Sequence, residues 1–398
     1  MNYTFTQKGK SITFVMIAIG LISVIAGFMM ESHQAWSNLL HNTIYFMLIA
    51  LGGTFFLAVQ YAAEDGWSAA IKRIPEAMGA FLPWAAGIML VVFFGNMMAA
   101  HNGSAHYLYH WMHSELFDPA SPEYDRIIAG KSGYLNLPFF LIRMLLYFVI
   151  WIGFTKALRK WSLKEDEIGG NEPYFRARRL SITFLVLYAV TSSTSAWDFI
   201  MSIDTHWYST LFGWYTFAGS FVSAIAIMNF ILAYLVRTGK MPWITEHHLH
   251  DAGKFMFAFS VFWTYLWFAQ FMLIWYANIP EEVTYFMIRF DHYRGLFLAN
   301  FFINFIAPFL LLMSRDAKRK PLLLMAVSVI LFVGHWIDTF LMVTPGVAKE
   351  HWQIGWMEVG TTIGFLGLFM FVVQSALAKA PLLREKHPLM QESLHHNI

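Results

Sequence analysis

Two ionisable residues stand three positions apart inside a long apolar run near the C-terminus. At this spacing His335 and Asp338 share one face of a helix, so they could exchange a proton or orient one another. A charged side chain at the centre of a bilayer costs about 2.5–3.5 kcal/mol on insertion scales, so each such residue is a functional hypothesis by default. The pair therefore predicts a proton relay.

Asp198, Glu358 and Arg143 lie in other apolar runs. Counting about 1.5 Å per residue from the ends of these runs places them, with Asp338, about 5–13 Å below the outer surface. With His335 slightly deeper, the set has the arrangement that a proton half-channel requires, and Arg143 would tune the pKa values of the carboxylates. The alternative is architectural: Arg143 paired with Asp198 or Glu358 would hold helices together.

Three further patterns could bind a cofactor, and each has a plainer interpretation. His106, His110 and His113 would present three imidazoles on one side of a helix, but no acidic residue to orient them is evident, which favours an aromatic interfacial loop. Haem b needs two histidines at facing depth, and His335 has no evident mate. The aromatic series beginning at Trp263 could contact a quinone, although its spacing is usual for packing.

The composition places these residues in a membrane. Of 398 residues, 58% are hydrophobic and only 13% are charged, against roughly 25% in soluble domains. The small net charge of +2 argues against a nucleic acid partner. The absence of cysteine excludes thiolate zinc sites, iron–sulfur ligation by cysteine and c-type haem attachment. Redox chemistry would require a histidine-ligated haem, a diffusible quinone or a partner's cofactor, and no metal site is predicted.

Ten runs of about 20 apolar residues recur along the chain, each long enough to cross a hydrocarbon core of about 30 Å as a helix. The predicted spans are 11–29, 39–62, 80–101, 135–157, 180–203, 211–236, 254–278, 292–313, 322–344 and 354–378. The first lacks a clear cleavage site, so we expect a retained span rather than a signal peptide. The predicted fold class is an all-α polytopic membrane protein.

Basic residues are retained on the cytoplasmic side of a membrane, which gives the orientation. Most of the 27 lysine and arginine residues fall in alternate loops that share one side with both termini. The other side holds only Arg126, Lys131, Arg289, Arg294 and Lys349. Both termini are therefore predicted to be cytoplasmic.

Spans two to five and six to nine each begin and end outside, which allows two four-helix bundles of the same orientation. A faint repeat supports this: the fifth span ends in Trp197-Asp198-Phe-Ile-Met and the ninth contains Trp336-Ile-Asp338-Thr-Phe-Leu-Met. The predicted organisation is a peripheral helix in 1–38, bundles in 39–203 and 204–344, and a last helix with its tail in 345–398. One peripheral helix would lie on either flank.

The two longest soluble stretches are predicted to differ in role. The outer loop 102–134 is rich in aromatic and histidine residues, so we expect it to dock a partner. The basic inner loop 158–179 and the C-terminal tail are expected to be solvated anchors. The inner half of the membrane is expected to hold few polar groups.

The segment 195–215 is more specific than any hydropathy profile. It reads Ser-Ala-Trp-Asp-Phe-Ile-Met-Ser-Ile-Asp-Thr-His-Trp-Tyr-Ser-Thr-Leu-Phe-Gly-Trp-Tyr and resembles the ActF-type membrane subunits of bacterial alternative complex III. The run 254–282, with Trp-Thr-Tyr-Leu-Trp-Phe-Ala-Gln-Phe, strengthens the resemblance, and length, span number and order agree over essentially the whole chain. The motif residues are Trp197, Asp198, Asp204, His206, Trp207, Trp214 and Tyr215.

This resemblance implies membership of the NrfD and polysulfide reductase membrane-subunit superfamily, with two four-helix bundles and two peripheral helices. Such complexes sit in the bacterial inner membrane, oxidise menaquinol or ubiquinol, and pass electrons through iron–sulfur clusters and c-type haems of periplasmic subunits. The implied partners are a sister membrane subunit of the ActC type, those periplasmic subunits, lipids and a terminal oxidase. In this family the quinol site lies in the sister subunit, and the ActF-type subunit is discussed as a proton pathway.

The hypothesis is a cofactor-free membrane subunit, not catalytic alone, that contributes quinone contact or a proton path to a quinol-oxidising complex. A stand-alone transporter or proton channel is the first rival, and it predicts activity of the single chain in liposomes. A purely structural subunit is the second. It predicts that Asp198→Asn, His335→Ala and Asp338→Asn leave quinol turnover and proton coupling unchanged.

Overall fold

The computed structural model describes residues 3–397 as an all-α protein with ten helices long and apolar enough to cross a membrane, which confirms the predicted fold class. The spans are α1 Gln7–Met30, α2 Ser32–Ala62, α3 Arg73–Gly79 with α4 Leu82–His101, α6 Leu137–Ile168, α7 Asn171–Phe199, α8 Phe212–Arg237, α9 Glu246–Ala277, α11 Arg294–Phe301 with α12 Ala307–Leu312, α14 Pro321–Ala348 and α15 Trp356–Leu377.

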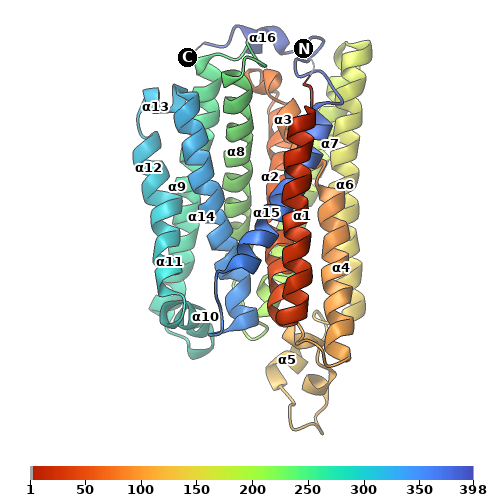
Figure 1. The fold of residues 1–398 in the computed structure, drawn as a ribbon, viewed down its shortest axis with the longest axis vertical. Helices are drawn as coiled ribbons and strands as arrows, with labels where there is room; N and C mark the ends of the chain where they lie inside the picture. Colours follow the sequence, from red (N-terminus) through yellow and green to blue (C-terminus); the bar gives the residue numbers. More distant parts are fainter. Residues whose placement is uncertain (1–2, 398) are drawn as a thin grey trace.

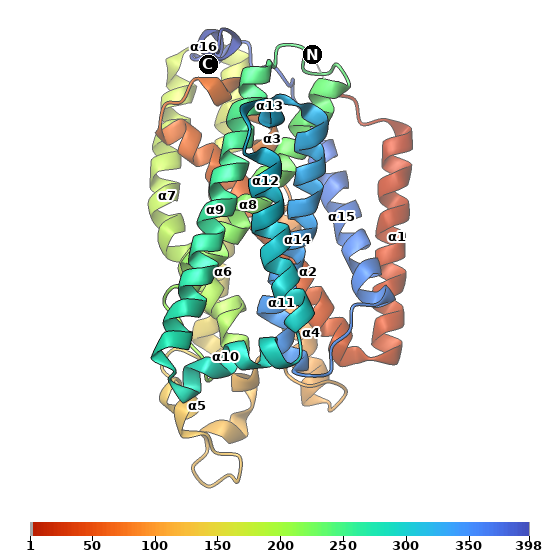
Figure 2. The same ribbon diagram turned by 90° about the vertical axis from the view of Figure 1, so that its left-hand side faces the viewer.

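The central spans form two groups of four helices that pack against one another. Helices α2, α4, α6 and α7 pack together, as do α8, α9, α11–α12 and α14. Helix α2 lies against both α8 and α14, so the two groups meet along the centre of the molecule (Figures 1 and 2). The residue boundaries 1–38, 39–203, 204–344 and 345–398 stay a prediction.

The peripheral helices α1 and α15 pack against one another on one side of the molecule (Figure 2). The prediction of one helix on either flank is therefore wrong. The reason is a glycine contact: a Cβ added at Gly20 would lie 2.3 Å from the Cα of Gly364. Small residues allow such close approach of backbones, which is a main source of helix association in lipid.

The basic stretch 158–179 is helical rather than a loop, which corrects the sequence-based expectation. Helix α6 continues to Ile168 and α7 begins at Asn171. The turn between them uses Gly169 and Gly170, with φ of 66° and 77°, values that glycine adopts without strain. Hydropathy falls at residue 157 because lysines and glutamates follow, but these residues are good helix formers, so the helices extend beyond the apolar runs.

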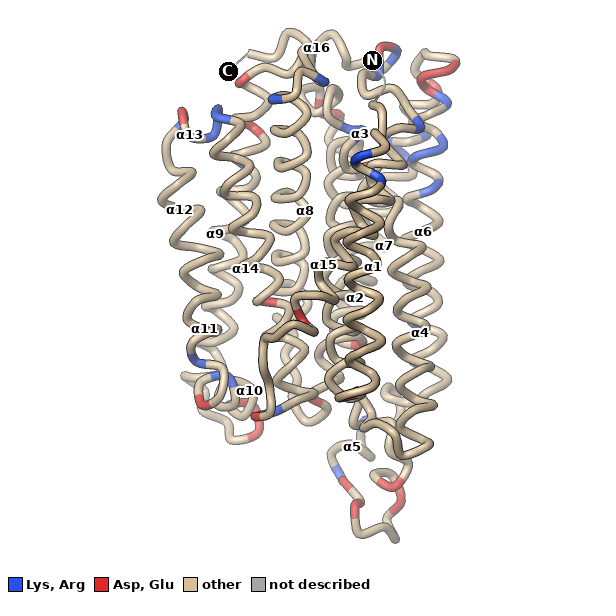
Figure 3. Tube along the Cα trace, viewed as in Figure 1, with Lys and Arg blue, Asp and Glu red and all other residues tan. Residues whose placement is uncertain are grey.

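Both termini lie at the same end of the bundle as α3 and the short helix α16, Met390–Leu394 (Figure 1). The opposite end carries α5, Arg126–Gly130, and α10, Pro280–Asp291. Most lysines and arginines gather at the end with the termini (Figure 3). We refer to these as the basic end and the outer end.

Candidate functional site

Asp338 lies where four helices of the second bundle converge. Its carboxylate accepts hydrogen bonds from the Tyr215 hydroxyl on α8, from Trp263 Nε1 on α9 at 3.0 Å and from Asn300 Nδ2 on α11 at 2.8 Å. The residue is 1% exposed. Its close partners are neutral donors, so hydrogen bonds rather than a cation stabilise the buried carboxylate.

His335 lies one helical turn from Asp338 on the same face of α14, as its spacing predicts. Its Nδ1 is 3.8 Å from Asp338 Oδ2, and neither ring nitrogen has a hydrogen-bond partner. The edge of the ring meets Trp263, with centroids 5.2 Å apart. Buried polar atoms without partners are uncommon, and a bridging water is a frequent reason.

A small cavity beside this pair has room for such a water. Its volume is about 10 Å³, close to the minimum that holds one water molecule. The polar residues that line it are Tyr45, Thr216, Ser220, Ser223, His335, Asp338 and Thr339. Hydroxyl groups therefore line the same small cavity as both partners of the predicted relay.

An irregular stretch of the eighth span positions Asn300. Helix α11 passes into α12 through a π-helical turn, Phe302–Ile306, a feature frequent at functional sites. Asn304 donates to Asn300 Oδ1 at 2.6 Å, which orients the Asn300 amide towards Asp338. Gly334 makes room for this chain, because a Cβ there would lie 2.2 Å from Asn304 Oδ1.

Polar groups continue from Asp338 towards the outer end. A second cavity of about 10 Å³ is lined by Tyr215, Asn300 and Arg289 of α10, among others. The Arg289 guanidinium lies 3.3 Å from the Tyr285 ring centroid, and its Nη2 is 3.8 Å from Asp204 Oδ2. Asp204 is partly exposed, so the series reaches the outer surface.

Asp198 has a different environment in the first bundle. Arg143 of α6 donates to both carboxylate oxygens, at 2.8 Å from Nε and 2.9 Å from Nη2. The Tyr147 hydroxyl donates at 2.7 Å, and the guanidinium stacks on Tyr134 at 3.8 Å. Of the two partners considered for Arg143, the structure selects Asp198. The bidentate geometry is that of a strong ion pair between α6 and α7.

Glu358 lies at the N-terminus of α15, which begins part-way along the bundle after the non-helical segment 349–355 (Figure 1). Its carboxylate accepts from Gln34 at 2.6 Å, from Asn38 at 2.9 Å and from the Gly355 backbone at 2.8 Å. The N-terminal end of a helix favours a negative charge. Glu358 therefore both caps α15 and ties it to α2.

A second amide extends this network to α14. Asn42 Oδ1 accepts from Thr362 at 2.9 Å and from Trp336 Nε1 at 3.4 Å. On the same helix as Asn42, His41 Nε2 lies 3.1 Å from the Trp336 carbonyl oxygen. Trp336 and His335 are neighbours in α14, so their side chains point in different directions from the helix. Helix α14 therefore lies between the Glu358 network and the Asp338 site.

The remaining residues of the 195–215 motif do not gather at one site. Trp207 stacks on Tyr285 with centroids 3.9 Å apart, next to the Arg289 series. His206 lies on the surface of the outer end, with its Nε2 2.6 Å from Asp125. Trp214 is 58% exposed, and the indole nitrogen of Trp197 has no partner.

The outer loop does not form the helix that three aligned histidines require. The segment that holds His110 and His113 has two short 3₁₀ turns, His110–Met112 and Ser114–Phe117. His106 precedes both turns, outside any helix. Within residues 3–397, no group of three or more histidine and carboxylate residues is placed to hold a metal ion.

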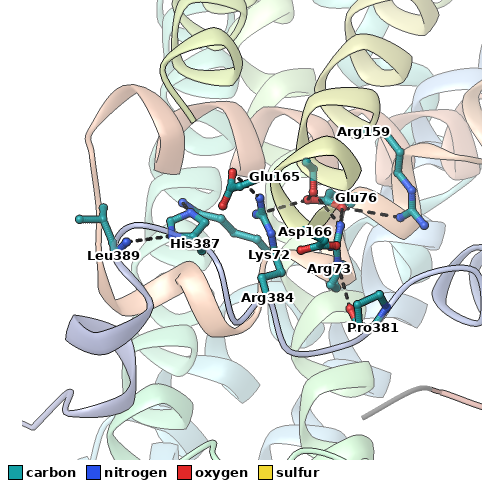
Figure 4. Close-up of polar contacts among 11 residues, drawn as sticks. Lys72, Arg73, Glu76, Arg159, Glu165, Asp166, Pro381, Arg384, His387 and Leu389 are labelled. Atoms are coloured by element: carbon teal, nitrogen blue, oxygen red, sulfur yellow. Dashed lines mark hydrogen bonds and ion pairs between the residues drawn. The ribbon is translucent and has the colours of Figure 1, made fainter. Parts of the chain in front are cut away.

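A cluster of buried charges lies at the basic end (Figure 4). Arg384 of the C-terminal tail is 1% exposed and binds Glu165 of α6 at 3.0 Å. Arg73 pairs with Glu76 at 2.7 Å and with Asp166. The expectation of a solvated tail is wrong for this stretch, because its arginine inserts between the carboxylates of α3 and α6.

Lys72 and His387 meet at the edge of this cluster (Figure 4). Lys72 Nζ lies 3.3 Å from His387 Nε2 and 4.2 Å from the Tyr61 ring centroid. Burial, together with the neighbouring Arg384, lowers the pKa of Lys72 to about 7. Burial, Lys72 and Arg384 together lower the pKa of His387. The imidazole is therefore neutral here, and its Nδ1 accepts a hydrogen bond from the Leu389 backbone N–H at 3.1 Å.

The sequence matches no protein-family model and no curated protein. The chain is an integral multi-pass membrane protein on the strength of its ten spans. The resemblance of segment 195–215 to alternative complex III remains a hypothesis about function.

Several hydrogen-bond donors to the predicted carboxylates were not predicted from the sequence. Asn300, Asn38 and Tyr147 bind Asp338, Glu358 and Asp198 respectively. A signal did exist for the amides: the pairs 38 and 42 in α2, and 300 and 304 in the eighth span, each stand four residues apart within apolar runs. Amides at that spacing share one helix face and can bond across helices in lipid.

Proposed function

We propose that this chain is the proton-conducting membrane subunit of a quinol-oxidising respiratory complex of the alternative complex III type. The observation that carries the proposal is the Asp338 site: a buried carboxylate held by neutral donors, beside His335 with neither ring nitrogen bonded. Intramembrane ionisable residues that face a bundle interior are characteristic of proton relays. Asp338 and His335 would exchange a proton with the outer end along the Asp204 and Arg289 series.

Quinol oxidation belongs to the neighbouring subunits in this proposal. The two cavities beside Asp338 measure about 10 Å³ each, which suits single waters and does not fit a quinone ring. We therefore expect no quinone to bind at this site. Without cysteine, the chain would rely on partners for the iron–sulfur clusters and haem c.

The proposed setting is the bacterial inner membrane with both termini cytoplasmic. The gathering of lysine and arginine at the basic end supports this orientation (Figure 3). The Asp338 series then opens to the periplasm, the side on which the resemblance places the iron–sulfur and cytochrome c subunits. A sister membrane subunit of the ActC type would supply the quinol site, and a terminal oxidase would accept the electrons.

The test is proton release per electron in proteoliposomes that contain the assembled complex. We expect Asp338→Asn to reduce this ratio severalfold while detergent-assayed quinol turnover persists. Glu123→Gln is the matched control, because it removes an exposed carboxylate of the outer loop and should leave the ratio unchanged. An unchanged ratio in both Asp338→Asn and His335→Gln complexes would overturn the relay.

Purification in mild detergent separates this proposal from its rivals. We expect the chain to be isolated with proteins that carry haem c and iron–sulfur clusters, visible by absorbance and identified by mass spectrometry. Isolation as a single chain that conducts protons in liposomes would instead establish the stand-alone channel.

A further inference from the structure

A groove at the basic end combines a basic rim with an apolar floor. It has a volume of about 760 Å³ and lies between α4, α6 and α15. Its apolar floor is formed by Trp84, Ile152, Phe371 and Val372. The basic residues at its rim are Lys156, Arg159, Lys160, Lys164 and Lys379.

The rim carries more positive charge than the chain neutralises. The acidic residues of the groove are Glu76 and Glu167, and Glu76 is already paired with Arg73 at 2.7 Å. Lys156, Lys160 and Lys379 are exposed, and within residues 3–397 none of them forms an ion pair. Even with Glu167 at the rim, an anion in the groove would therefore meet an excess of ammonium groups.

Arg159 is fixed in position at the wall of this groove. Its Nη2 donates to the Ala376 carbonyl at 2.7 Å, and its Nη1 lies 3.7 Å from Glu76. That Nη1 is buried and has no hydrogen-bond partner of its own. A guanidinium held in this way contributes a positive charge at a fixed position in the wall of the groove.

The groove lies at the depth of lipid headgroups. Lys156 is 19 residues after the first residue of α6, Leu137, which is a rise of about 28 Å against a hydrocarbon core of about 30 Å. Trp84 is 51% exposed at the same end of α4, where indoles mark the interface. The lysines therefore stand at headgroup level, and the floor continues into the acyl-chain region.

We propose that this groove binds an anionic phospholipid, with the phosphate among Lys156, Arg159 and Lys160 and an acyl chain along Trp84 and Ile152. Charge and shape agree on this occupant, because a free anion would leave the apolar floor uncovered and a zwitterionic lipid would not balance the charge. Basic pockets between transmembrane helices on the cytoplasmic side bind such headgroups. This inference does not depend on the proposed respiratory function.

Native mass spectrometry of the full-length protein with defined lipids tests the proposal. Phosphatidylglycerol should be retained in preference to phosphatidylcholine at equal concentration. The variant Lys156→Gln/Lys160→Gln/Lys379→Gln should lose that preference, since each basic side chain contributes about fivefold to anionic-lipid binding. The control Lys8→Gln/Lys10→Gln/Arg179→Gln removes the same charge elsewhere at the basic end and should retain it.

Three results would overturn the proposal. Equal retention of the two lipids would show that the headgroup charge is not recognised. Equal losses in the groove variant and the control would show non-specific attraction. Thermal stabilisation by inorganic phosphate that matches the stabilisation by phosphatidylglycerol would show an anion site without a lipid chain.

Discussion

The two bundles each bury an aspartate near a tyrosine, and they balance its charge differently. Asp198 on α7 binds Arg143 through two hydrogen bonds, whereas Asp338 on α14 is held by Tyr215, Trp263 and Asn300. Protonation of Asp198 would break an ion pair and leave a buried guanidinium unpaired. Protonation of Asp338 leaves no buried guanidinium unpaired, so a change of charge at this site costs less free energy.

The cluster at the basic end follows the same rule as Asp198. There the carboxylates Glu76 and Glu165 each bind an arginine, and Arg384 reaches both. Such groups join α3, α6 and the C-terminal tail. Buried paired charges thus connect helices both here and at Asp198, and the Asp338 site stands apart from them.

Removal of Arg143 should have the largest effect on stability. Arg143→Gln leaves Asp198 buried without its cation, and breaking a buried pair costs about 3–5 kcal/mol. Unfolding in mixed micelles measures this loss. The double variant Arg143→Gln/Asp198→Asn should recover most of it, and failure to do so would mean that Asp198 does not depend on Arg143 for charge balance.

Asp338→Asn should cost less, about 1–3 kcal/mol, in the same assay. The new amide nitrogen faces groups that donate hydrogen bonds, so one bond is lost, but no buried charge is left unpaired. A loss as large as that of Arg143→Gln would show that Asp338 is as architectural as Asp198 and would remove the contrast.

Lowering the pH should destabilise the folded protein through His387, at the edge of the charge cluster of the basic end. Its pKa is lowered in the folded protein, whereas an unfolded histidine titrates near 6.5, so below about pH 6.5 the unfolded state binds the extra proton. Stability should therefore fall by up to about 1.4 kcal/mol per pH unit below that point.

Thermal unfolding from pH 5 to 8 checks this dependence. His387→Gln should flatten it, and His351→Gln, which removes an 88% exposed imidazole, should not. Equal slopes in the wild type and His387→Gln would refute a neutral buried His387. Above pH 7 the lowered pKa of Lys72 also makes stability rise with pH, because the unfolded chain keeps that proton up to about pH 10.4.

Hydropathy and helix spacing predicted part of this molecule, and the reason is physical. Every span was visible because lipid demands an unbroken apolar run, and His335 and Asp338 were paired because three residues make almost one turn. Contacts between distant segments were not visible. The insertion of Arg384 between α3 and α6, and the contact of Gly20 with Gly364, depend on packing across more than 200 positions, which a local pattern does not encode.

His335→Gln should have the smallest effect on stability and is the sharpest test of the contrast. Neither nitrogen of His335 has a partner in the protein, so the substitution breaks no hydrogen bond to another residue and should cost no more than about 1 kcal/mol. His41 is the matched control, because it is equally buried but lies 3.1 Å from the Trp336 carbonyl, and His41→Gln should cost more. In the assembled complex the order should reverse: His335→Gln should lower proton release per electron, and His41→Gln should preserve it. A large loss of stability in His335→Gln with unchanged proton release would make His335 a packing residue and leave Asp338 without its exchange partner.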